Sequence, residues 1–269
     1  MSASDMGSPF DWSSRSSYDY TAELAHRDWA WEFLRPNPEF QKSRQQSQDR
    51  FEVVSAELAL TIIRARVKQS GLNRWGCLYT DAPDIDARSA KVFWLPSRNA
   101  SVLRMYAAPA NAKLDTALFD LRNQLCPVSL LIMPDGMQHA LFHGSGHGVQ
   151  LAVSGASLLE PVYLLADSVL GRREAKLRIE ALRRYNDFIA GAPPQPPAYE
   201  QTERLRNVLQ ALHGSLAGAS HRDIAVALFG AERVKADWND PGENLRDCVR
   251  RAVKRGRDLM NGGYLKFLR

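Results

Sequence analysis

Residues 245–269 read LRDCVRRAVKRGRDLMNGGYLKFLR and contain eight lysines or arginines against two aspartates. At about 100° per residue, this spacing predicts an amphipathic helix with one apolar side. We expect the buried side to consist of Leu245, Cys248, Val249, Ala252, Val253, Gly256, Leu259 and Met260. Asn261, Gly262 and Gly263 should end the helix, because glycine enters left-handed conformations without a steric penalty.

A cationic stripe runs beside the apolar side of this helix. Its members follow one another at spacings of four, four and three residues, which keeps them on one side. They are Arg246, Arg250, Lys254 and Arg257. Their mutual repulsion costs stability unless an anionic surface lies across them. A membrane-surface helix is disfavoured, because the apolar side lacks Trp and Phe and because Asp247 and Asp258 interrupt the polar side. A nucleic-acid surface is favoured, and a solvated or protein-binding face is the alternative.

Two further helices are expected before the basic one, the first near residues 200–216. The second spans SHRDIAVALFG, with Ser220 as its N-cap, Asp223 three residues later and Gly230 at its end. The segment AERVKADWNDPG then follows, longer than the three- to four-residue turn of an ordinary helix-turn-helix. This order predicts an all-α, helix-turn-helix-like DNA-binding domain with an extended turn over residues 200–269. Its candidate DNA-binding residues are Arg246, Arg250, Arg251, Lys254, Arg255, Arg257, His221, Arg222 and Lys235.

Length and charge indicate how the chain divides into domains and where its excess positive charge lies. The 269 residues favour two domains over one. Residues 200–269 hold 13 Lys/Arg and 9 Asp/Glu, hence +4 of the net charge of +5, so the excess charge belongs to this part of the chain. Three lone cysteines without CxxC spacing argue against a disulfide framework or a cysteine zinc site. With no apolar signal segment and no apolar run near the ~20 residues that span a bilayer, we expect a cytoplasmic, nucleoid-associated protein with no membrane partner.

The remaining chain divides by composition and pattern, and the predicted fold class is α+β. N-terminal helices precede a small, mainly antiparallel sheet in the middle, where short apolar runs alternate with turn clusters such as PDG and GSG. Residues 39–70 are expected to be mostly helical, and GAPPQPPAY, with four prolines in nine residues, is expected to be a stiff linker. The predicted segments are a disordered tail at 1–17, a helical module at 18–70, a β-rich region at 71–156, a helical segment at 157–190 and the linker at 191–199.

Three aromatic residues crowd the first predicted helix. Trp29, Trp31 and Phe33 lie within five residues, so they cannot all point to one side of a short helix. They belong either to the core or to a docking surface, since aromatic residues dominate both. We hypothesise that residues 18–50 dock on the C-terminal domain opposite its basic face.

Catalytic and metal motifs find little support. His139, His143 and His147 recur every fourth residue, a spacing that suits zinc on a helix. The neighbouring glycines predict a hairpin with its turn near GSG, where this spacing loses its meaning, so surface or hydrogen-bonded histidines are favoured. No GxSxG, HExxH or GxxxxGK[ST] motif occurs. We therefore predict neither enzyme activity nor a cofactor, and an enzyme that uses the histidine hairpin is the least favoured hypothesis.

The pattern LRNVLQALHGSLAGASHRDIAVALFG, followed by LRDCVRRAVKRGRDLMNGGYLKFLR, resembles an extended-turn helix-turn-helix domain of bacterial regulators carried by mobile elements. The segment YDYTAELAHRDWAWEFLRPNPEF resembles the N-terminal module of the longer members, which activate excision and conjugative-transfer genes of integrative and conjugative elements. The resemblance covers residues 18–50 and 200–269 closely and the middle loosely.

The resemblance implies that a basic face of the C-terminal domain binds double-stranded promoter DNA while the opposite face packs on the N-terminal module. It also implies that small antiactivators with an acidic face compete for that module. The predicted function is therefore a sequence-specific transcriptional activator, with RNA polymerase as a possible partner. The alternative is an antiactivator or adaptor whose basic helix binds an acidic protein surface.

Overall fold

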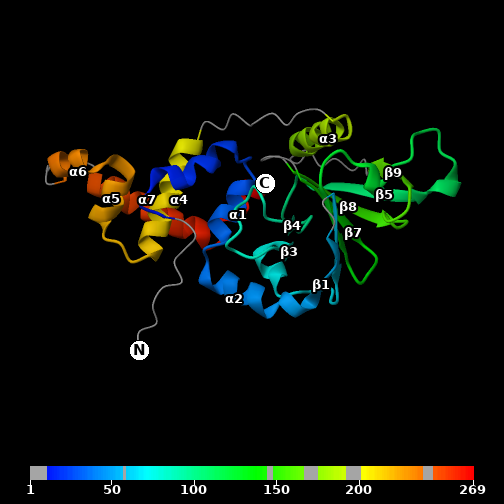
Figure 1. Cartoon of the computed structure of the whole chain (residues 1–269), viewed down its shortest axis with the longest axis horizontal. Helices are drawn as coiled ribbons and strands as arrows, with labels where there is room; N and C mark the ends of the chain where they lie inside the picture. The colour runs from blue at the N-terminus through cyan, green and yellow to red at the C-terminus, as the bar shows by residue number, and fades with distance from the viewer. Residues whose placement is uncertain (1–10, 57–58, 144–147, 167–174, 192–200, 239–244) are drawn as a thin grey trace.

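A computed structural model describes residues 11–56, 59–143, 148–166, 175–191, 201–238 and 245–269. The predicted α+β class is confirmed. Four helices of the C-terminal segment gather at one end of the molecule, a seven-stranded sheet lies at the other, and the N-terminal helices lie between them (Figure 1). The linker predicted at 191–199 falls, apart from its first residue, outside the described residues.

The chain enters through a 3-10 helix and two short α-helices. These are η1 (Arg15–Glu23), α1 (Asp28–Leu34) and α2 (Pro38–Gln46). The side chain of Asn37 caps α2 by accepting hydrogen bonds from the backbone N–H groups of Glu39 and Phe40 at 2.9 and 3.1 Å. Pro38 occupies the first helical position, where a backbone N–H has no helical acceptor, so the missing N–H of proline costs nothing. The prediction of disorder up to residue 17 is wrong for residues 11–17, which form structure against the C-terminal helices, whereas residues 1–10 lie outside the described part.

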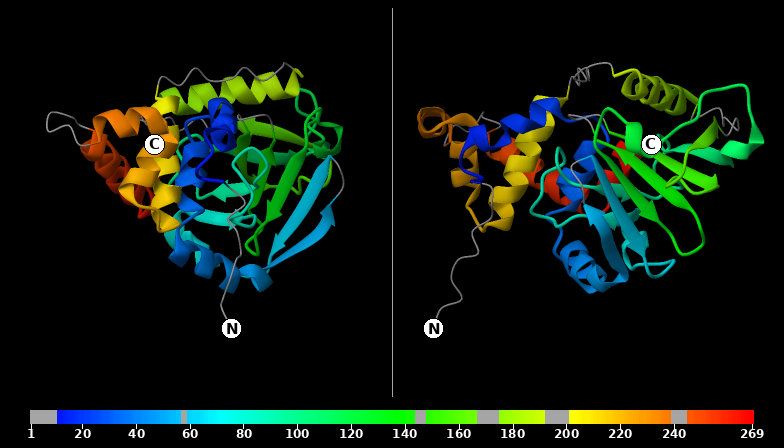
Figure 2. Two further views of the ribbon diagram at one scale, coloured as in Figure 1. Left: turned by 60° about the vertical axis from the view of Figure 1, so that its left-hand side comes forward. Right: turned by 45° about the vertical axis from the view of Figure 1, so that its right-hand side comes forward.

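The main sheet is mixed but mainly antiparallel. Its strand order is β1-β2-β6-β7-β8-β5-β9, with parallel pairing only between β2 and β6 and between β5 and β8. The bounds are β1 Phe51–Ala56, β2 Leu60–Ala65, β5 Leu103–Pro109, β6 Val128–Ile132, β7 Gln138–Phe142, β8 Val149–Gly155 and β9 Val162–Ala166. A separate pair, β3 (Cys77–Thr80) with β4 (Val92–Trp94), covers one face of the sheet. Helix α3 (Ala175–Ile189) covers the other face (Figure 2).

Two helical predictions are wrong at the edges of this sheet. Residues 51–56 and 60–65 form a hairpin where helix was expected, and β9 at 162–166 lies in the predicted helical segment 157–190. Both β1 and β9 are edge strands with many exposed side chains, so their sequences lack the buried alternation of an inner strand. The helix expected near the end of that segment is present as α3.

The C-terminal helices match the local signals of the sequence. They are α4 (Thr202–Leu216), α5 (His221–Phe229), α6 (Ala231–Asp237) and α7 (Leu245–Met260), followed by the 3-10 helix η6 (Gly263–Leu268). The predicted cap of α5 is confirmed as a capping box: Ser220 Oγ accepts from the N–H of Asp223, and the Asp223 carboxylate accepts from the N–H of Ser220, both at 3.2 Å. The expected long turn holds the short helix α6, and residues 239–244 lie outside the described part.

Helices α4 and α7 cross in close contact at Gly256. A Cβ atom on Gly256 would lie 2.8 Å from Cβ of Leu212 and 3.1 Å from the carbonyl oxygen of Val208. These neighbours belong to the body of α4, which cannot move aside as the end of a flexible side chain can. The absence of a side chain at Gly256 therefore sets the distance between the two helices.

The largest core joins three separate parts of the chain. It combines η1, α1 and α2 with the β3–β4 pair and with the inner sides of α4, α7 and η6. A smaller core lies beneath α5, α6 and the first turns of α7. The C-terminal helices thus share their main apolar surface with the N-terminal segment. None of the helices in the described ranges has the length and apolar character needed to cross a bilayer.

Valine at Gly256 should separate α4 from α7. Overpacking of a well-packed contact typically costs roughly 1–3 kcal/mol, so Gly256→Val should lower the free energy of unfolding by about that amount. Chemical denaturation followed by circular dichroism measures the change. Cys248→Val places the same β-branched residue on the exposed side of α7 and should leave the midpoint nearly unchanged. Equal midpoints for the two variants would contradict the close crossing.

Candidate nucleic-acid interface

Helix α7 has one buried side and one solvent-facing side. Buried along it are Leu245, Val249, Val253, Gly256, Leu259 and Met260. Cys248, predicted on this side, is exposed instead, because it lies at the border of the apolar arc. The solvent-facing side carries six cations and two aspartates, a net charge of 6 − 2 = +4 on this helix.

The stripe of four cations is exposed and only lightly neutralised. Arg250 pairs with Asp247 at 3.2 Å and Lys254 with Asp258 at 2.8 Å, each within α7. All four side chains of these pairs are more than half exposed, and such surface pairs contribute only about 0–1 kcal/mol. A phosphate can therefore replace either aspartate as the partner at little cost.

The ends of the stripe are held by neighbouring helices. Arg257 donates from Nη2 to Oγ of Ser215 at the C-terminal end of α4, at 2.9 Å. The Arg246 guanidinium lies over the ring of Trp238, 5.2 Å from its centroid, just after α6. These contacts orient the two arginines and leave both positively charged.

The other candidate residues surround this stripe at different places. Arg251 is exposed and donates from Nε to the carbonyl of Asp247 at 3.2 Å. Arg255 is half-buried on the flank of α7 that lies away from the stripe. His221 and Arg222 are exposed in the first turn of α5, and Lys235 is exposed on α6. Six of the nine candidate residues thus lie on α7, and the other three lie on α5 and α6.

The aromatic residues of α1 are all buried, on two different sides. Trp29 stacks on Phe33 at a centroid distance of 6.0 Å, and Phe33 stacks in turn on Phe267 of η6 at 6.0 Å. Trp31 points the other way: its indole N–H donates to the carbonyl of Ile85 at 2.9 Å. Helix α1 is therefore enclosed between the C-terminal helices and the segment that precedes β4.

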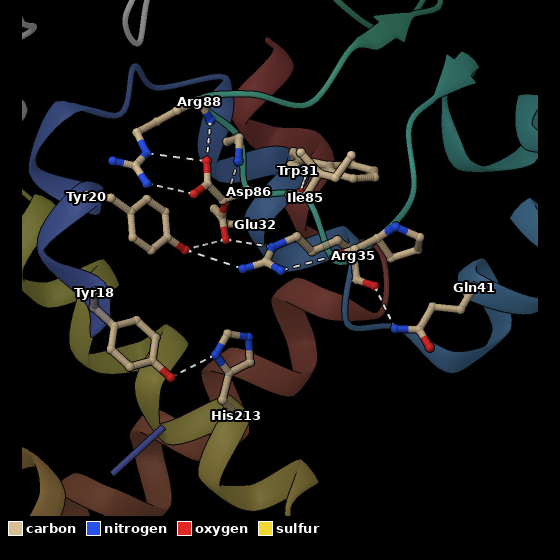
Figure 3. Close-up of polar contacts among 12 residues, drawn as sticks. Tyr18, Tyr20, Trp31, Glu32, Arg35, Gln41, Ile85, Asp86, Arg88 and His213 are labelled. Atoms are coloured by element: carbon tan, nitrogen blue, oxygen red, sulfur yellow. Dashed lines mark hydrogen bonds and ion pairs between the residues drawn. The ribbon is translucent and has the colours of Figure 1, made fainter. Parts of the chain in front are cut away.

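A buried ion pair lies in the same helix (Figure 3). Arg35 Nε donates to Oε2 of Glu32 at 2.8 Å, and the Tyr20 hydroxyl donates to the same oxygen at 2.7 Å. The other oxygen, Oε1, accepts from the N–H of Ala87 at 2.8 Å. Glu32 is fully buried, so these three donors replace the water that a carboxylate needs. Burial, and then the Glu32 carboxylate, raises the pKa of Tyr20 and keeps its hydroxyl protonated as a donor.

Two further polar contacts tie the N-terminal segment to the C-terminal helices. The Tyr18 hydroxyl lies 2.8 Å from Nδ1 of His213 in α4, and Asn37 Nδ2 donates to the carbonyl of Met260 at the end of α7, at 3.2 Å. Burial, and then the charge of Arg35, lowers the pKa of His213 to about 3, so this imidazole is neutral at physiological pH. The sequence indicated neither contact, because the partners are far apart in the chain.

The histidine hairpin does not form a metal site among the described residues. Strands β7 and β8 pair as the predicted hairpin, while the GSG turn and His147 lie outside the described residues. His139 is buried in β7, and His143 Nε2 lies 2.8 Å from Oγ of Ser129. Burial lowers the pKa of both histidines to about 4. No three His, Cys, Asp or Glu side chains gather within the described ranges in a way that could hold a metal ion.

Two family models match this chain. Residues 169–269 match the model described as T6SS, Transcription factor, DNA binding domain. Residues 11–79 match the model described as Proteobacterial transcriptional regulator-like domain, which includes residues 11–17 that were expected to be disordered. No curated protein matches the chain. The chain is thus a transcriptional regulator with a DNA-binding domain in its C-terminal part, and neither description is that of an enzyme.

The burial of His213 should make stability fall in acid. The folded pKa of about 3 lies below the ordinary histidine value of about 6.5, so the neutral imidazole stabilises the fold above pH 6.5 and loses this effect as the pH falls toward 3. His139 and His143 act in the same direction. His213→Gln should therefore reduce the loss of unfolding free energy between pH 7.5 and pH 5 by up to ~1.4 kcal/mol per pH unit below 6.5.

Urea denaturation at the two pH values measures this difference. His221→Gln is the matched control, since His221 is exposed on α5 and its replacement should leave the pH dependence of the wild type unchanged. If His213→Gln shows the full acid loss of the wild type, His213 is not the buried neutral group described above.

Proposed function

We propose that this chain is a sequence-specific transcriptional activator whose helix α7 lies in the major groove of promoter DNA. The observation that carries the proposal is the division of α7 into a side buried in the core and a side with six exposed or half-exposed cations. The major groove, about 12 Å wide, admits one α-helix. A basic helix that packs on its own domain through one side can present the other side to base edges and phosphates.

The neighbouring helices support this placement. Arg257 lies beside the end of α4, Arg246 lies beside Trp238, and the exposed His221 and Arg222 begin α5. We propose that the stripe contacts phosphates on one side of the groove and that Arg251 faces the base edges. Lys235 and the first turn of α5 add contacts to the flanking backbone.

The choice of target genes rests on likeness alone. The resemblance implies genes for excision and conjugative transfer of an integrative and conjugative element, and the description of the family that matches residues 169–269 names T6SS. Both agree on a transcription factor that binds DNA. We propose the mobile-element genes as targets, with the protein acting at the nucleoid in the cytoplasm and engaging RNA polymerase there.

The N-terminal segment is the proposed site for an antiactivator. Trp29 and Phe33 pack toward η6, while Trp31 packs toward the segment before β4. This packing supports a model in which residues 18–50 orient the C-terminal helices with their basic side outward. An antiactivator of similar fold would compete for the surface of α1 that now contacts η6. The alternative function, a basic helix that binds an acidic protein, is favoured by no separate contact.

Charge reversal on α7 should abolish DNA binding without unfolding the chain. Arg250 and Lys254 are exposed, so Arg250→Glu with Lys254→Glu places carboxylates against phosphates and leaves the core intact. For the full-length wild type, four to six phosphate contacts predict a slope of log affinity against log salt of roughly −4 to −5. Gel-shift titration of duplex DNA from the promoter regions beside the chain's own gene measures both.

Two comparisons make this test decisive. The milder pair Arg250→Gln with Lys254→Gln should weaken binding less than the glutamate pair, since it removes charge without adding repulsion. A promoter reporter should lose expression with the glutamate pair, whereas a gain of expression would indicate a repressor. A wild-type salt slope near zero, or full binding by a folded glutamate pair, would exclude α7 as the DNA-binding helix.

A further inference from the structure

A second group of cations lies on the other flank of α7. Arg204 in the first turn of α4, Arg255 in α7 and Lys266 in η6 come from three different elements. The crossing at Gly256 brings α4 to this part of α7, because Arg255 directly precedes Gly256 and Arg204 lies one turn before Val208. Helix η6 follows α7 after two residues, and Lys266 lies near enough to Arg255 and Arg204 for their charges to act on it. We call these three residues the α4–η6 cluster.

The electrostatics of the cluster are unfavourable in the free protein. Burial, and then the charges of Arg255 and Arg204, lowers the pKa of Lys266, so each of the two arginines repels the Lys266 ammonium. Within the described residues, no carboxylate forms an ion pair with any of the three. Arg250 and Lys254 on the stripe each have such a partner. The Lys266 ammonium lies 5.0 Å from the centroid of the Phe267 ring, a contact that orients it without removing its charge.

The cluster and the stripe lie on different flanks of the same helix. At about 100° per residue, Arg255 is roughly 140° around α7 from Arg250 and roughly 160° from Arg257. The arc between the flanks holds Lys254 and Arg251 together with Asp247 and Asp258, and it faces solvent. A helix in the major groove has a phosphate backbone on each side of it, so cations on two flanks match the two DNA strands.

We infer that Arg204, Arg255 and Lys266 form a phosphate-binding cluster that contacts the DNA strand opposite to the one bound by the stripe. This inference rests on the proposed function, because it takes α7 as the helix in the groove. It adds Arg204 of α4 and Lys266 of η6 to the binding surface. It also explains why three cations are held together without a carboxylate, since the DNA backbone supplies the missing negative charge.

Phosphate contacts carry no base information, and this property gives the cluster a distinct signature. Arg204→Gln with Lys266→Gln should weaken binding to specific and scrambled duplexes by the same factor. Loss of two phosphate contacts should make the salt slope shallower by about 2, which corresponds to a roughly thirty- to hundredfold loss of affinity near 0.1 M salt. Arg255 is left unchanged because it is half-buried.

The experiment uses the full chain and two duplexes, one from the promoter region beside the chain's own gene and one of scrambled sequence. Gel shifts at several salt concentrations give the slope, and circular dichroism shows whether each variant is folded. The matched control is Lys113→Gln with Arg64→Gln, which removes two exposed charges from the sheet end of the molecule and should leave the slope unchanged.

The outcomes separate the two proposals. In one outcome the wild type binds DNA, the α7 glutamate pair abolishes binding, and the folded Arg204/Lys266 variant keeps the wild-type salt slope. This outcome overturns the cluster inference and leaves the proposed function standing. If the wild type binds neither duplex, both the proposed function and the cluster inference are overturned. A shallower slope with an equal loss on both duplexes supports the cluster, whereas a loss confined to the promoter duplex would assign these residues to base recognition and overturn it.

Discussion

The enclosure of α1 is the constraint on which the other contacts depend. This helix has only seven residues, and six of them are buried. So short a helix is not stable alone in water, because the cost of nucleation is not recovered over two turns. It persists because η6 and α7 pack on one side of it and the segment before β4 packs on the other. The same packing covers the apolar sides of α4 and α7, so the N-terminal segment and the C-terminal helices stabilise each other as one unit.

Enclosure places a charge in the core, and the structure satisfies it completely. Glu32 lies on α1 and Arg35 directly follows this helix, and a hydroxyl and a backbone N–H complete the coordination of the carboxylate. A buried pair of this kind contributes little net stability relative to apolar residues, but the removal of one partner leaves an uncompensated charge. The pair therefore acts mainly on geometry. It requires η1, α1 and the residues near Ala87 to meet in one arrangement, and that arrangement sets where the C-terminal helices can pack.

Local signals in the sequence predicted local structure, and contacts between distant segments escaped them. The periodicity of α7 and the cap at Ser220 were predictable, because each is contained in a few consecutive residues. Strand β1 was missed because an edge strand lacks the buried alternation that marks an inner strand, and Cys248 was misplaced at the border of the apolar arc. The cations of α7 could be found from spacing. Arg204 and Lys266 could not, since they lie on α4 and η6 and approach Arg255 only through the packing of these elements on α7.

The shared core also bears on how fast any competitor for the N-terminal segment could act. Trp29 and Phe33 have no exposed surface, and Phe267 from the C-terminal end of the chain stacks on Phe33. A competing protein would find no accessible part of this contact in the folded molecule. It would have to wait for a partial opening that exposes both aromatic rings, and such openings are rare where burial is complete. Its inhibition would then be set by an opening rate rather than by its own concentration. Regulation of this kind would act most readily on newly made chains, before the C-terminal helices have closed over α1.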